Sequence, residues 1–332
     1  MRLLMIAPEQ FPVPGGGSVE ICMLEIAKKL SRKHQVTLIS RNKTHSKKIS
    51  RLGKNLTIVR VPSGSSTRYI SSVLRFMKKR HFDLIQVDNR PYYMARIKAA
   101  FPHTPISLFL HSLTIIPRTK SVAACLRKAD LIIANSSSLK QCLSKSFPDT
   151  RQKIRCVHLG VNLSRFEPAS MTERMNTKQV YRLGRSFVIL FVGRVIPRKG
   201  VPLLIKAAKK VGEKISNTKL IIAGKGRKSY IAKLRLQANK LRVPMMFLGS
   251  IPHTKIHQIY RLADCFVCPS QKHEAFGLVN VEAMASGVPV IASNIGGIKE
   301  IVAHGDNGYL VNNYTNDSSF AYYITKWLKT VD

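Results

Sequence analysis

The sequence predicts an α/β protein built from two doubly wound domains, and three observations predict this class. The chain has 332 residues, which at about 100–200 residues per domain favours two domains. Short apolar runs alternate with segments of helical periodicity, as expected for the strands and helices of a parallel sheet. The same alternation begins again near the middle of the chain, so each half is expected to contain one such sheet.

The first half opens with a strand–helix–strand unit. Residues 2–7 are apolar, a helical stripe of Ile21, Leu24, Ile26 and Ala27 follows within residues 19–30, and residues 36–40 are apolar again. Further apolar runs predict strands at residues 56–61, 84–87, 106–110, 131–134 and 154–159. Together these runs predict a parallel sheet of about seven strands.

The second half repeats the pattern, with strands predicted at residues 187–192, 220–223, 245–248, 265–268, 290–292 and 308–311. The stretch 164–186 is polar, contains Pro168 and Gly184, and is the expected hinge. We therefore predict a first domain at residues 1–165, a linker at 166–186 and a second domain at 187–332. Two Rossmann-like domains joined in this way would face each other across a cleft. The carboxyl ends of their strands, where such sheets bind ligands, would line it.

The composition is that of a soluble globular protein. Hydrophobic residues make up 45% of the chain and charged residues 22%, which excludes wholesale disorder, collagen and coiled coil. No apolar run reaches the roughly 18–20 residues of a membrane span. Residues 1–7 are too short for the hydrophobic region of a secretory signal. The expected location is the cytoplasm.

Six cysteines are scattered along the chain, and only Cys265 and Cys268 are spaced as a CxxC. A zinc ribbon needs a second such pair. Residues 264–269 read as a strand, in which the two thiols would point to opposite faces. We expect buried, reduced cysteines here and no metal site.

Charge is the main anomaly of the composition. The chain has 55 Lys and Arg residues against 17 Asp and Glu, a formal net charge of +38, and residues 28–80 contain sixteen basic residues and no acidic one. Such a field attracts an anionic membrane or an acidic polymer, and a merely solvated basic face is the alternative. Nucleic acid is not expected as a partner, because the stretch lacks interleaved aromatic residues and no nucleic-acid-binding motif is present.

Three consecutive glycines, residues 15–17, precede the first predicted helix. An NAD fingerprint would place GxGxxG directly after the first strand, whereas here residues 8–14 intervene. A dinucleotide at this turn is therefore not expected. Glycines at a helix N-terminus still let the backbone approach an anion closely, and a flexible turn is the alternative.

Two carboxylates lie around the start of a helix predicted over residues 278–285. Glu274 lies in the loop before this helix, Glu282 lies one turn inside it, and Phe276-Gly277-Leu278 stands between them. Carboxylates in these places can accept hydrogen bonds from sugar and ribose hydroxyls, while the amides of Gly277 and Leu278 face a phosphate. The two carboxylates become a specific pattern when they are set beside the residues that follow them, Gly287, Pro289, Gly296, Gly297 and Gly308.

This stretch resembles the GT-B glycosyltransferases of the retaining family 4 type. The resemblance rests on the E-x7-E of Glu274 and Glu282 within PSQKHEAFGLVNVEAMASGVPVIASNIGGIKEIVAHGDNGYLV. It continues through FVGRVIPRKG, AGKG and LGS in the second half and through GGG, FLHS, IIANS and GVNLSRF in the first. It therefore covers almost the whole chain. The stretch VDNRP is similar to members associated with bacterial spore coats.

The resemblance implies a role for each matching residue of the second domain. Arg194 and Lys199 would bind the donor diphosphate and stabilise the charge of the leaving nucleotide. Glu274 would hold hydroxyls of the donor sugar, supported by the backbone around Phe276. Glu282 would bind the ribose. Gly277 and Leu278 would hold the phosphate through their main-chain amides.

In the first domain the resemblance implies that Gly16 and Gly17 close on the same diphosphate and that His111 lies near the sugar C1. It also implies a retaining reaction, in which the acceptor attacks the face that the nucleotide leaves and the leaving phosphate takes the acceptor's proton. That scheme needs no side-chain nucleophile and no metal, and the sequence contains no Asp-x-Asp. The expected catalytic residues are His111, Glu274, Arg194 and Lys199.

The expected activity is transfer of a sugar from a nucleotide-diphosphate sugar, most of all a UDP-sugar. The expected acceptor is a glycan, a lipid-linked sugar, or a component of the cell envelope or a coat. Neither a metal ion nor a bound cofactor is expected to take part. The transfer would take place in the cytoplasm, at the inner membrane surface or on a spore coat. One alternative is a catalytically silent GT-B scaffold that acts as a basic structural protein on an anionic surface. The short stretch after the last predicted strand, only about 20 residues, favours this alternative. Family members usually have a helix there that crosses back from the second domain and packs on the first. The other alternative is a nucleotide-sugar epimerase or phosphorylase on the same fold.

Overall fold

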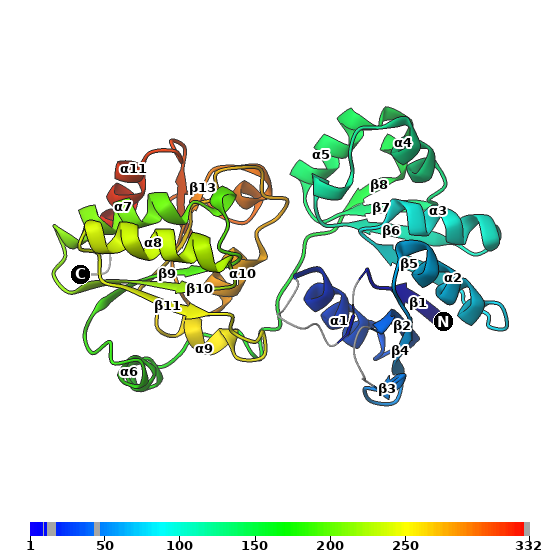
Figure 1. The fold of residues 1–332 in the computed structure, drawn as a ribbon, viewed down its shortest axis with the longest axis horizontal. Helices are drawn as coiled ribbons and strands as arrows, with labels where there is room; N and C mark the ends of the chain where they lie inside the picture. The colour runs from blue at the N-terminus through cyan, green and yellow to red at the C-terminus, as the bar shows by residue number, and fades with distance from the viewer. Residues whose placement is uncertain (9, 12–17, 43–46, 329–332) are drawn as a thin grey trace. The chain divides into compact units, whose positions relative to one another are not determined.

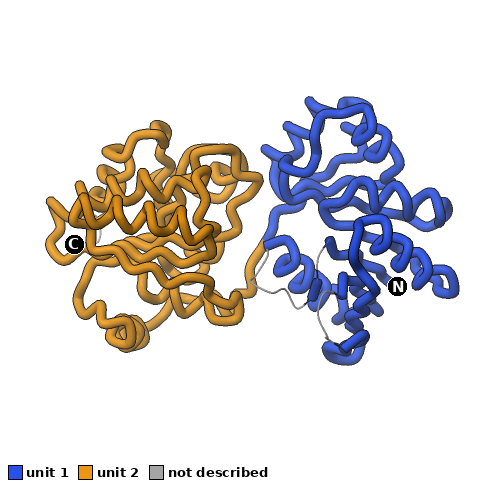
Figure 2. Tube along the Cα trace, viewed as in Figure 1, with its two compact units in different colours: residues 1–159 blue, residues 160–332 orange. Residues whose placement is uncertain are grey.

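The computed structural model describes residues 1–8, 10–11, 18–42 and 47–328. The chain divides into two compact units, residues 1–159 (unit 1) and residues 160–332 (unit 2), as Figure 2 shows. Each unit contains one sheet with helices packed on it (Figure 1). Two α/β units, each built on a sheet of parallel strands, confirm the predicted fold class.

Unit 1 contains an eight-stranded sheet in the order β3-β4-β2-β1-β5-β6-β7-β8. Its elements are β1 (Arg2–Ile6), α1 (Ser18–Leu30), β2 (Gln35–Asn42), β3 (Ile49–Arg51), β4 (Leu56–Pro62), α2 (Ser66–Met77), β5 (Leu84–Asp88), α3 (Pro91–Ala100), β6 (Ile106–Leu110), η1 (Leu113–Ile115), α4 (Lys120–Arg127), β7 (Leu131–Ala134), α5 (Ser137–Ser146), η2 (Pro148–Lys153) and β8 (Ile154–Cys156).

All seven strands predicted for the first half are present and run parallel to one another. The eighth strand, β3, was not predicted. It pairs antiparallel with β4 at the edge of the sheet. With three residues, no buried side chain and Ile49 57% exposed, it lacks the apolar run by which the other strands are recognised.

Unit 2 contains a six-stranded sheet in the order β11-β10-β9-β12-β13-β14, with every pair parallel. Its elements are α6 (Met171–Val180), β9 (Phe187–Val192), η3 (Pro197–Lys199), α7 (Val201–Gly212), β10 (Thr218–Ala223), α8 (Lys228–Lys240), β11 (Met245–Gly249), α9 (Ile256–Tyr260), β12 (Cys265–Cys268), α10 (Leu278–Ala285), β13 (Val290–Ser293), η4 (Gly296–Glu300), β14 (Gly308–Val311) and α11 (Asp317–Leu328).

The sheet of unit 2 is covered by helices on both faces. Successive side chains along each strand point alternately to one face and to the other. One face packs against α7, α8 and α11, and the other against α9, α10 and η4 (Figure 1). Cys265 belongs to the first cluster and Cys268 to the second, so the two thiols point to opposite faces as predicted. Both are buried, free thiols.

The stretch predicted as a linker, residues 166–186, belongs to unit 2, and the chain changes unit between Leu159 and Gly160. Its polar residues form a helix, α6, rather than an extended hinge. The Ser170 hydroxyl caps this helix in a reciprocal capping box with Glu173. Lys178 then donates to Asp264 at 2.7 Å and ties the helix to the start of β12.

The strand order marks one place in each sheet where a ligand is expected. The order reverses between β9 and β12 in unit 2 and between β1 and β5 in unit 1. Open sheets of this kind bind ligands at such reversal points, beyond the carboxyl ends of the strands. Among the described residues, none of the helices has the length and apolar character to cross a bilayer.

Candidate functional site

Two loops meet at the reversal point of unit 2. The loop after β9 carries Arg194 and leads through η3 to Lys199, and the loop after β12 carries Ser270 and Glu274. The two loops are bonded to each other, since the amide of Gln271 donates to the carbonyl oxygen of Arg198 at 2.8 Å. The candidate site of unit 2 is therefore built from residues that follow two neighbouring strands.

Lys199 and Glu274 form the central contact of this site. Lys199 Nζ donates to Oε2 of Glu274, and their side chains are 13% and 19% exposed. The Ser270 hydroxyl lies 3.4 Å from the same carboxylate oxygen. A lysine and a glutamate predicted for different parts of one donor are thus paired with each other, and each neutralises the other's charge.

Glycines let the backbone pack closely around this pair. A Cβ atom at Gly296 would lie 2.1 Å from the carbonyl oxygen of Glu274, and one at Gly200 would lie 1.9 Å from the carbonyl oxygen of Pro269. Both glycines also have positive φ angles, 56° and 74°. Side chains at these positions would push the Glu274 loop away from its neighbours, so glycine is required for the position of Glu274.

The N-terminus of α10 lies directly after this loop. Gly277 is its N-cap, with φ of 93° and no side chain to cap the helix. The first amides of a helix lack partners within it and carry partial positive charge. Leu278 is the first helical residue, and Phe276 is buried before it. Phe276, Gly277 and Leu278 therefore place helix-start amides beside Glu274, as a phosphate site requires.

Glu282 lies in a different environment, although it is only eight residues from Glu274. It is buried inside α10, and both its carboxylate oxygens are hydrogen-bonded. His253 Nε2 lies 3.0 Å from Oε1, and the Tyr260 hydroxyl donates to Oε2 at 2.8 Å. Burial, followed by the charge of Glu282, raises the pKa of Tyr260 well above its usual value. The hydroxyl therefore remains a hydrogen-bond donor to this carboxylate.

The remaining predicted residues of unit 2 and unit 1 are placed as follows. Arg194 is exposed just after β9, so its guanidinium is available to an anion from solvent. His111 belongs to unit 1, and Gly16 and Gly17 lie outside the described residues. Unit 2 therefore brings Lys199, Glu274, Gly277 and Leu278 together, with Glu282 deeper in the same helix.

In unit 1, His111 follows β6 at the carboxyl edge of the sheet, as predicted. Its Nε2 lies 3.1 Å from Oδ2 of Asp88, and both side chains are buried. The other Asp88 oxygen accepts a hydrogen bond from Gln86 at 2.8 Å. His111 also stacks on Phe109, with ring centroids 4.3 Å apart. The imidazole is thus held in one orientation by a carboxylate and an aromatic ring.

Three residues of the candidate site, Asp88, His253 and Tyr260, are not marked by any of the sequence motifs. Asp88 is the last residue of β5, which neighbours β6, so a polar residue at the end of the adjacent strand was the signal that could have found it. His253 lies after β11 and Tyr260 ends α9, and no motif marks their contact with Glu282. Their contacts with Glu282 are formed by the packing of the helices and cannot be found from local sequence.

Described residues of unit 1 line a cavity and an open hollow. A cavity of about 250 Å³ lies next to the carboxyl edge of the sheet, where His111 is found. It is lined mainly by apolar side chains of α3, η1 and α4, together with Asn89 and Arg90. Asn89 Oδ1 accepts a hydrogen bond from the His111 amide at 2.8 Å, which joins this cavity to the candidate site. A larger open hollow of about 560 Å³, lined by residues such as Lys33 and Asp83, lies at the amino ends of the strands and is not near these residues.

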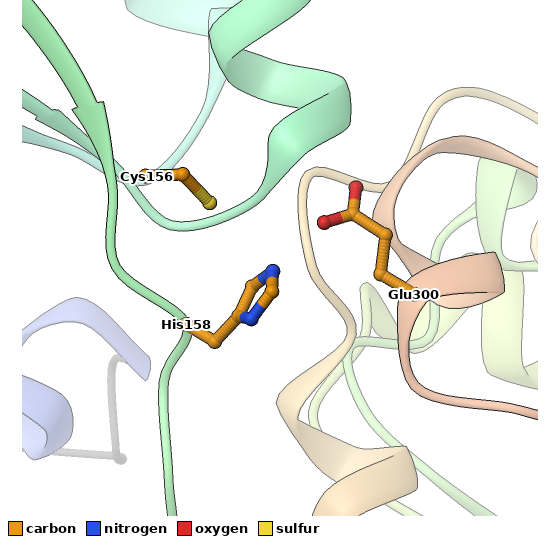
Figure 3. Close-up of side chains that lie close together, drawn as sticks. All are labelled: Cys156, His158 and Glu300. Carbon is orange, nitrogen blue, oxygen red and sulfur yellow. The ribbon is translucent and has the colours of Figure 1, made fainter.

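Three side chains of metal-binding type are shown in Figure 3: Cys156, His158 and Glu300. Cys156 ends β8 and His158 follows it in unit 1, whereas Glu300 ends η4 in unit 2. Within the described residues of either unit taken alone, no three such side chains come together. We assign no metal site to them.

Comparison with protein families matches both units. The family described as "Glycosyltransferase Family 4" matches residues 15–165, and the family described as "Glycosyl transferases group 1" matches residues 173–331. "Putative glycosyltransferase YtcC" of Bacillus subtilis (strain 168) is 30% identical over 337 residues, which are 97% of this chain and 82% of that protein. "Spore coat protein SA" of the same organism is 28% identical over 99% of this chain and 90% of its own length.

A solved structure has the same fold. The Anabaena protein Alr3699/HepE, solved in complex with UDP-glucose, superimposes with a TM-score of 0.77 at 22% identity, over 100% of this chain and 90% of that one. Both sheets of the present chain are thus accounted for by one known architecture.

Proposed function

This chain belongs to the group 1 glycosyltransferases of family 4 type with the GT-B fold, and from that premise we propose that it is a retaining enzyme that uses a nucleotide-diphosphate sugar, a UDP-sugar in the first place. The observation that carries the proposal is the Lys199–Glu274 pair beside the uncapped N-terminus of α10. A lysine for a phosphate, helix-start amides for the same phosphate and a carboxylate for sugar hydroxyls are adjacent there. The complex of HepE with UDP-glucose supports this choice of donor.

Donor binding would exchange the partners of the central pair. The diphosphate would draw Lys199 away from Glu274, and Glu274 would then accept hydrogen bonds from sugar hydroxyls. Arg194, exposed after β9, would add a second cation on the diphosphate. Glu282, deeper in α10, would accept hydrogen bonds from the ribose.

The chemistry would be departure of the nucleoside diphosphate and attack by the acceptor on the same face of the sugar. Lys199 and Arg194 would stabilise the charge that develops on the leaving phosphate, and that phosphate would take the acceptor's proton. The Cys268 thiol near Lys199 does not serve as a nucleophile in this scheme, because burial raises its pKa and keeps it protonated. His111, oriented by Asp88, would contact the donor sugar.

With these two cations on the diphosphate, transfer would need no metal ion. Activity is therefore expected to persist in EDTA. Loss of activity in EDTA that manganese or magnesium restores would contradict this part of the proposal.

The acceptor is proposed to be a glycan or a lipid-linked sugar. The cavity beside Asn89 is mainly apolar and has Arg90 in its lining, which suits the apolar part of an amphiphilic acceptor with a negative group. Release of nucleotide from UDP-, GDP- and ADP-sugars, measured with and without added acceptors, tests the proposed activity and identifies the donor.

We also propose that the basic stretch of unit 1 attaches the protein to an anionic surface, at the inner membrane surface or on a spore coat. Lys47, Lys48, Lys78, Lys79 and Arg80 are exposed. Two arginines of the same stretch, Arg41 and Arg60, are buried and donate to backbone carbonyls, so they do not add to this surface.

Replacing the five exposed residues by glutamine should weaken binding to vesicles that contain anionic lipid while nucleotide affinity is retained, since each basic residue near such a bilayer contributes about 1 kcal/mol. Wild-type protein that stays free of both anionic vesicles and acidic glycans at low salt would refute the attachment.

A second candidate is a catalytically silent scaffold on the same surface. The name of the spore coat relative favours it. Nucleotide release from none of the sugars in the panel, by protein that still binds the anionic surface, would favour the scaffold over the enzyme.

A further inference from the structure

The carboxylate of Glu282 is held by two side chains that no sequence motif identifies. Its side chain is 6% exposed, His253 approaches Oε1 at 3.0 Å, and Tyr260 donates to Oε2 at 2.8 Å. We call Arg165, His253, Tyr260 and Glu282 the Glu282 cluster. All four belong to unit 2, so their arrangement is set within one compact unit.

Arg165 determines which nitrogen of His253 carries the proton. Its Nη1 lies 3.3 Å from His253 Nδ1. A guanidinium is a hydrogen-bond donor only, so Nδ1 must accept and the proton of the neutral ring must lie on Nε2. That proton points at Oε1 of Glu282. The contact with Arg165 therefore selects this one tautomer of His253.

The ring of His253 is also packed. It lies against Phe166, with ring centroids 5.8 Å apart, and Phe166 is itself buried in the core of unit 2. Its position is therefore fixed by packing on one side and by hydrogen bonds at both nitrogens. A donor held in this way orients the carboxylate that it contacts.

The carboxylate of Glu282 keeps acceptor capacity beyond its two contacts within the cluster. Each oxygen of a carboxylate can accept about two hydrogen bonds, and each oxygen of Glu282 receives one from the cluster. One acceptor position per oxygen then remains for a ligand. Two parallel acceptor positions match two neighbouring hydroxyl groups, as on C2′ and C3′ of a ribose.

We propose that His253 is a positioning residue for the nucleotide, which orients Glu282 so that its two oxygens accept hydrogen bonds from the 2′- and 3′-hydroxyls of the donor ribose. This inference rests on the proposed function, in which Glu282 binds the ribose, and it adds the residue that orients this carboxylate. His253 acts through Glu282 and does not itself contact the ribose. Tyr260 fixes the second oxygen in the same way.

The test compares a ribose ligand with one that lacks both hydroxyls. Binding of UDP and of 2′,3′-dideoxy-UDP is measured by calorimetry for the wild type, His253→Ala, His253→Gln and His257→Ala. If UDP does not bind, GDP or ADP and its dideoxy form is used. His257 is the matched control, because it packs on the same Phe166 ring, at 6.5 Å, without a hydrogen bond to Glu282. Binding of the dideoxy ligand also reports that each variant is folded.

We expect the wild type to bind UDP about tenfold more tightly than the dideoxy form, as loss of hydrogen bonds to a charged group predicts. His253→Ala should lose most of this difference while its affinity for the dideoxy form is unchanged. The glutamine variant should recover part of the difference, because its amide can donate to Oε1. His257→Ala should keep the ratio of the wild type.

Three results would overturn the inference, and they are distinguishable. If the wild type binds both ligands equally, the ribose is not recognised by its hydroxyls, although nucleotide binding stands. If His253→Ala keeps the wild-type ratio, or if His257→Ala loses as much, His253 has no positioning role. If the wild type binds no nucleoside diphosphate at all, the proposed function fails together with the inference.

Discussion

The two carboxylates around the start of α10 are eight residues apart and are held in opposite ways. Glu274 lies in a loop, partly exposed, and its partner is the amine of a lysine. Glu282 lies inside the helix, is 5% exposed, and its partners are a histidine and a tyrosine. One contact is an ion pair between two long side chains at the surface of the site, and the other is a set of hydrogen bonds in the core.

This difference means that a bound ligand can take the place of one partner in the Lys199–Glu274 ion pair, whereas it cannot easily replace the hydrogen-bond partners of Glu282. A diphosphate can compete with Glu274 for the charge of Lys199, because both groups are anions near solvent. A ligand that replaced the partners of Glu282 would cost the buried Tyr260 hydroxyl its shorter hydrogen bond and leave it only the carbonyl oxygen of Val279, at 3.3 Å. We infer that Glu274 changes partners during binding, whereas Glu282 provides a fixed reference point.

The largest effect is expected from removal of the exchangeable cation. Lys199→Ala should lower kcat/KM by about 10²–10³, the range for loss of one group that stabilises developing charge, and should weaken nucleoside diphosphate binding by about tenfold or more. Steady-state kinetics and calorimetry measure the two effects. Lys206→Ala, on the exposed side of α7, is the control and should leave both values unchanged. A Lys199→Ala enzyme with wild-type kcat/KM would remove the central pair from the mechanism.

The second prediction concerns a variant that moves the carboxylate of Glu274 but leaves Glu274 itself unchanged. Gly296→Ala should destabilise unit 2 by roughly 2–3 kcal/mol and reduce activity, because the new Cβ would clash with the carbonyl of Glu274. Gly305→Ala is matched for backbone strain, since both glycines have positive φ, but a Cβ at Gly305 would meet nothing within 4 Å. It should cost less stability and leave activity intact. Equal losses of activity in the two variants would contradict the argument.

Most of the fold could be predicted from the sequence, because its strands are buried on both faces and read as continuous apolar runs. The helix Leu278–Ala285 also has the bounds that were predicted. The polar stretch 166–186 predicts a linker, but polar residues are as typical of a surface helix as of a loop. Contacts made in the folded unit, such as those of α6 with Asp264, distinguish the two.

The candidate site was predictable in its residue types and not in its contacts. Lys199 and Glu274 are 75 positions apart, and they meet because β9 and β12 are neighbours, which apolar runs alone do not reveal. The contact of His253 with Glu282 spans 29 positions and depends on how α10 packs beside the loop after β11. Tertiary packing, rather than local pattern, decides these pairs.

The third prediction compares the stability contribution of the two carboxylates. Glu282→Ala should reduce the free energy of unfolding by about 1–3 kcal/mol, since it removes the shorter of the two hydrogen bonds of the buried Tyr260 hydroxyl and leaves only the carbonyl oxygen of Val279. Glu274→Ala should cost less than Glu282→Ala, because the Lys199 ammonium that it leaves unpaired keeps some access to water. Urea unfolding of the two variants measures both values. If the Glu274→Ala protein is less stable than the Glu282→Ala protein, Glu274 makes the fixed contact and Glu282 the exchangeable one, contrary to our assignment.

The smallest effect concerns His257, which packs on the same Phe166 ring as His253. Burial, and then the charges of Arg261 and Arg165, lower the pKa of His257. Because the folded protein favours the neutral ring, the unfolded chain binds a proton more readily, and stability should fall slightly as the pH drops below about 6.5. Arg261→Gln should raise the pKa of His257 toward its usual value, as measured by NMR titration of the ring. Glu274→Gln, in the other region, should leave it unchanged. If both variants shift this pKa equally, the two regions are electrostatically coupled and the carboxylates are not independent.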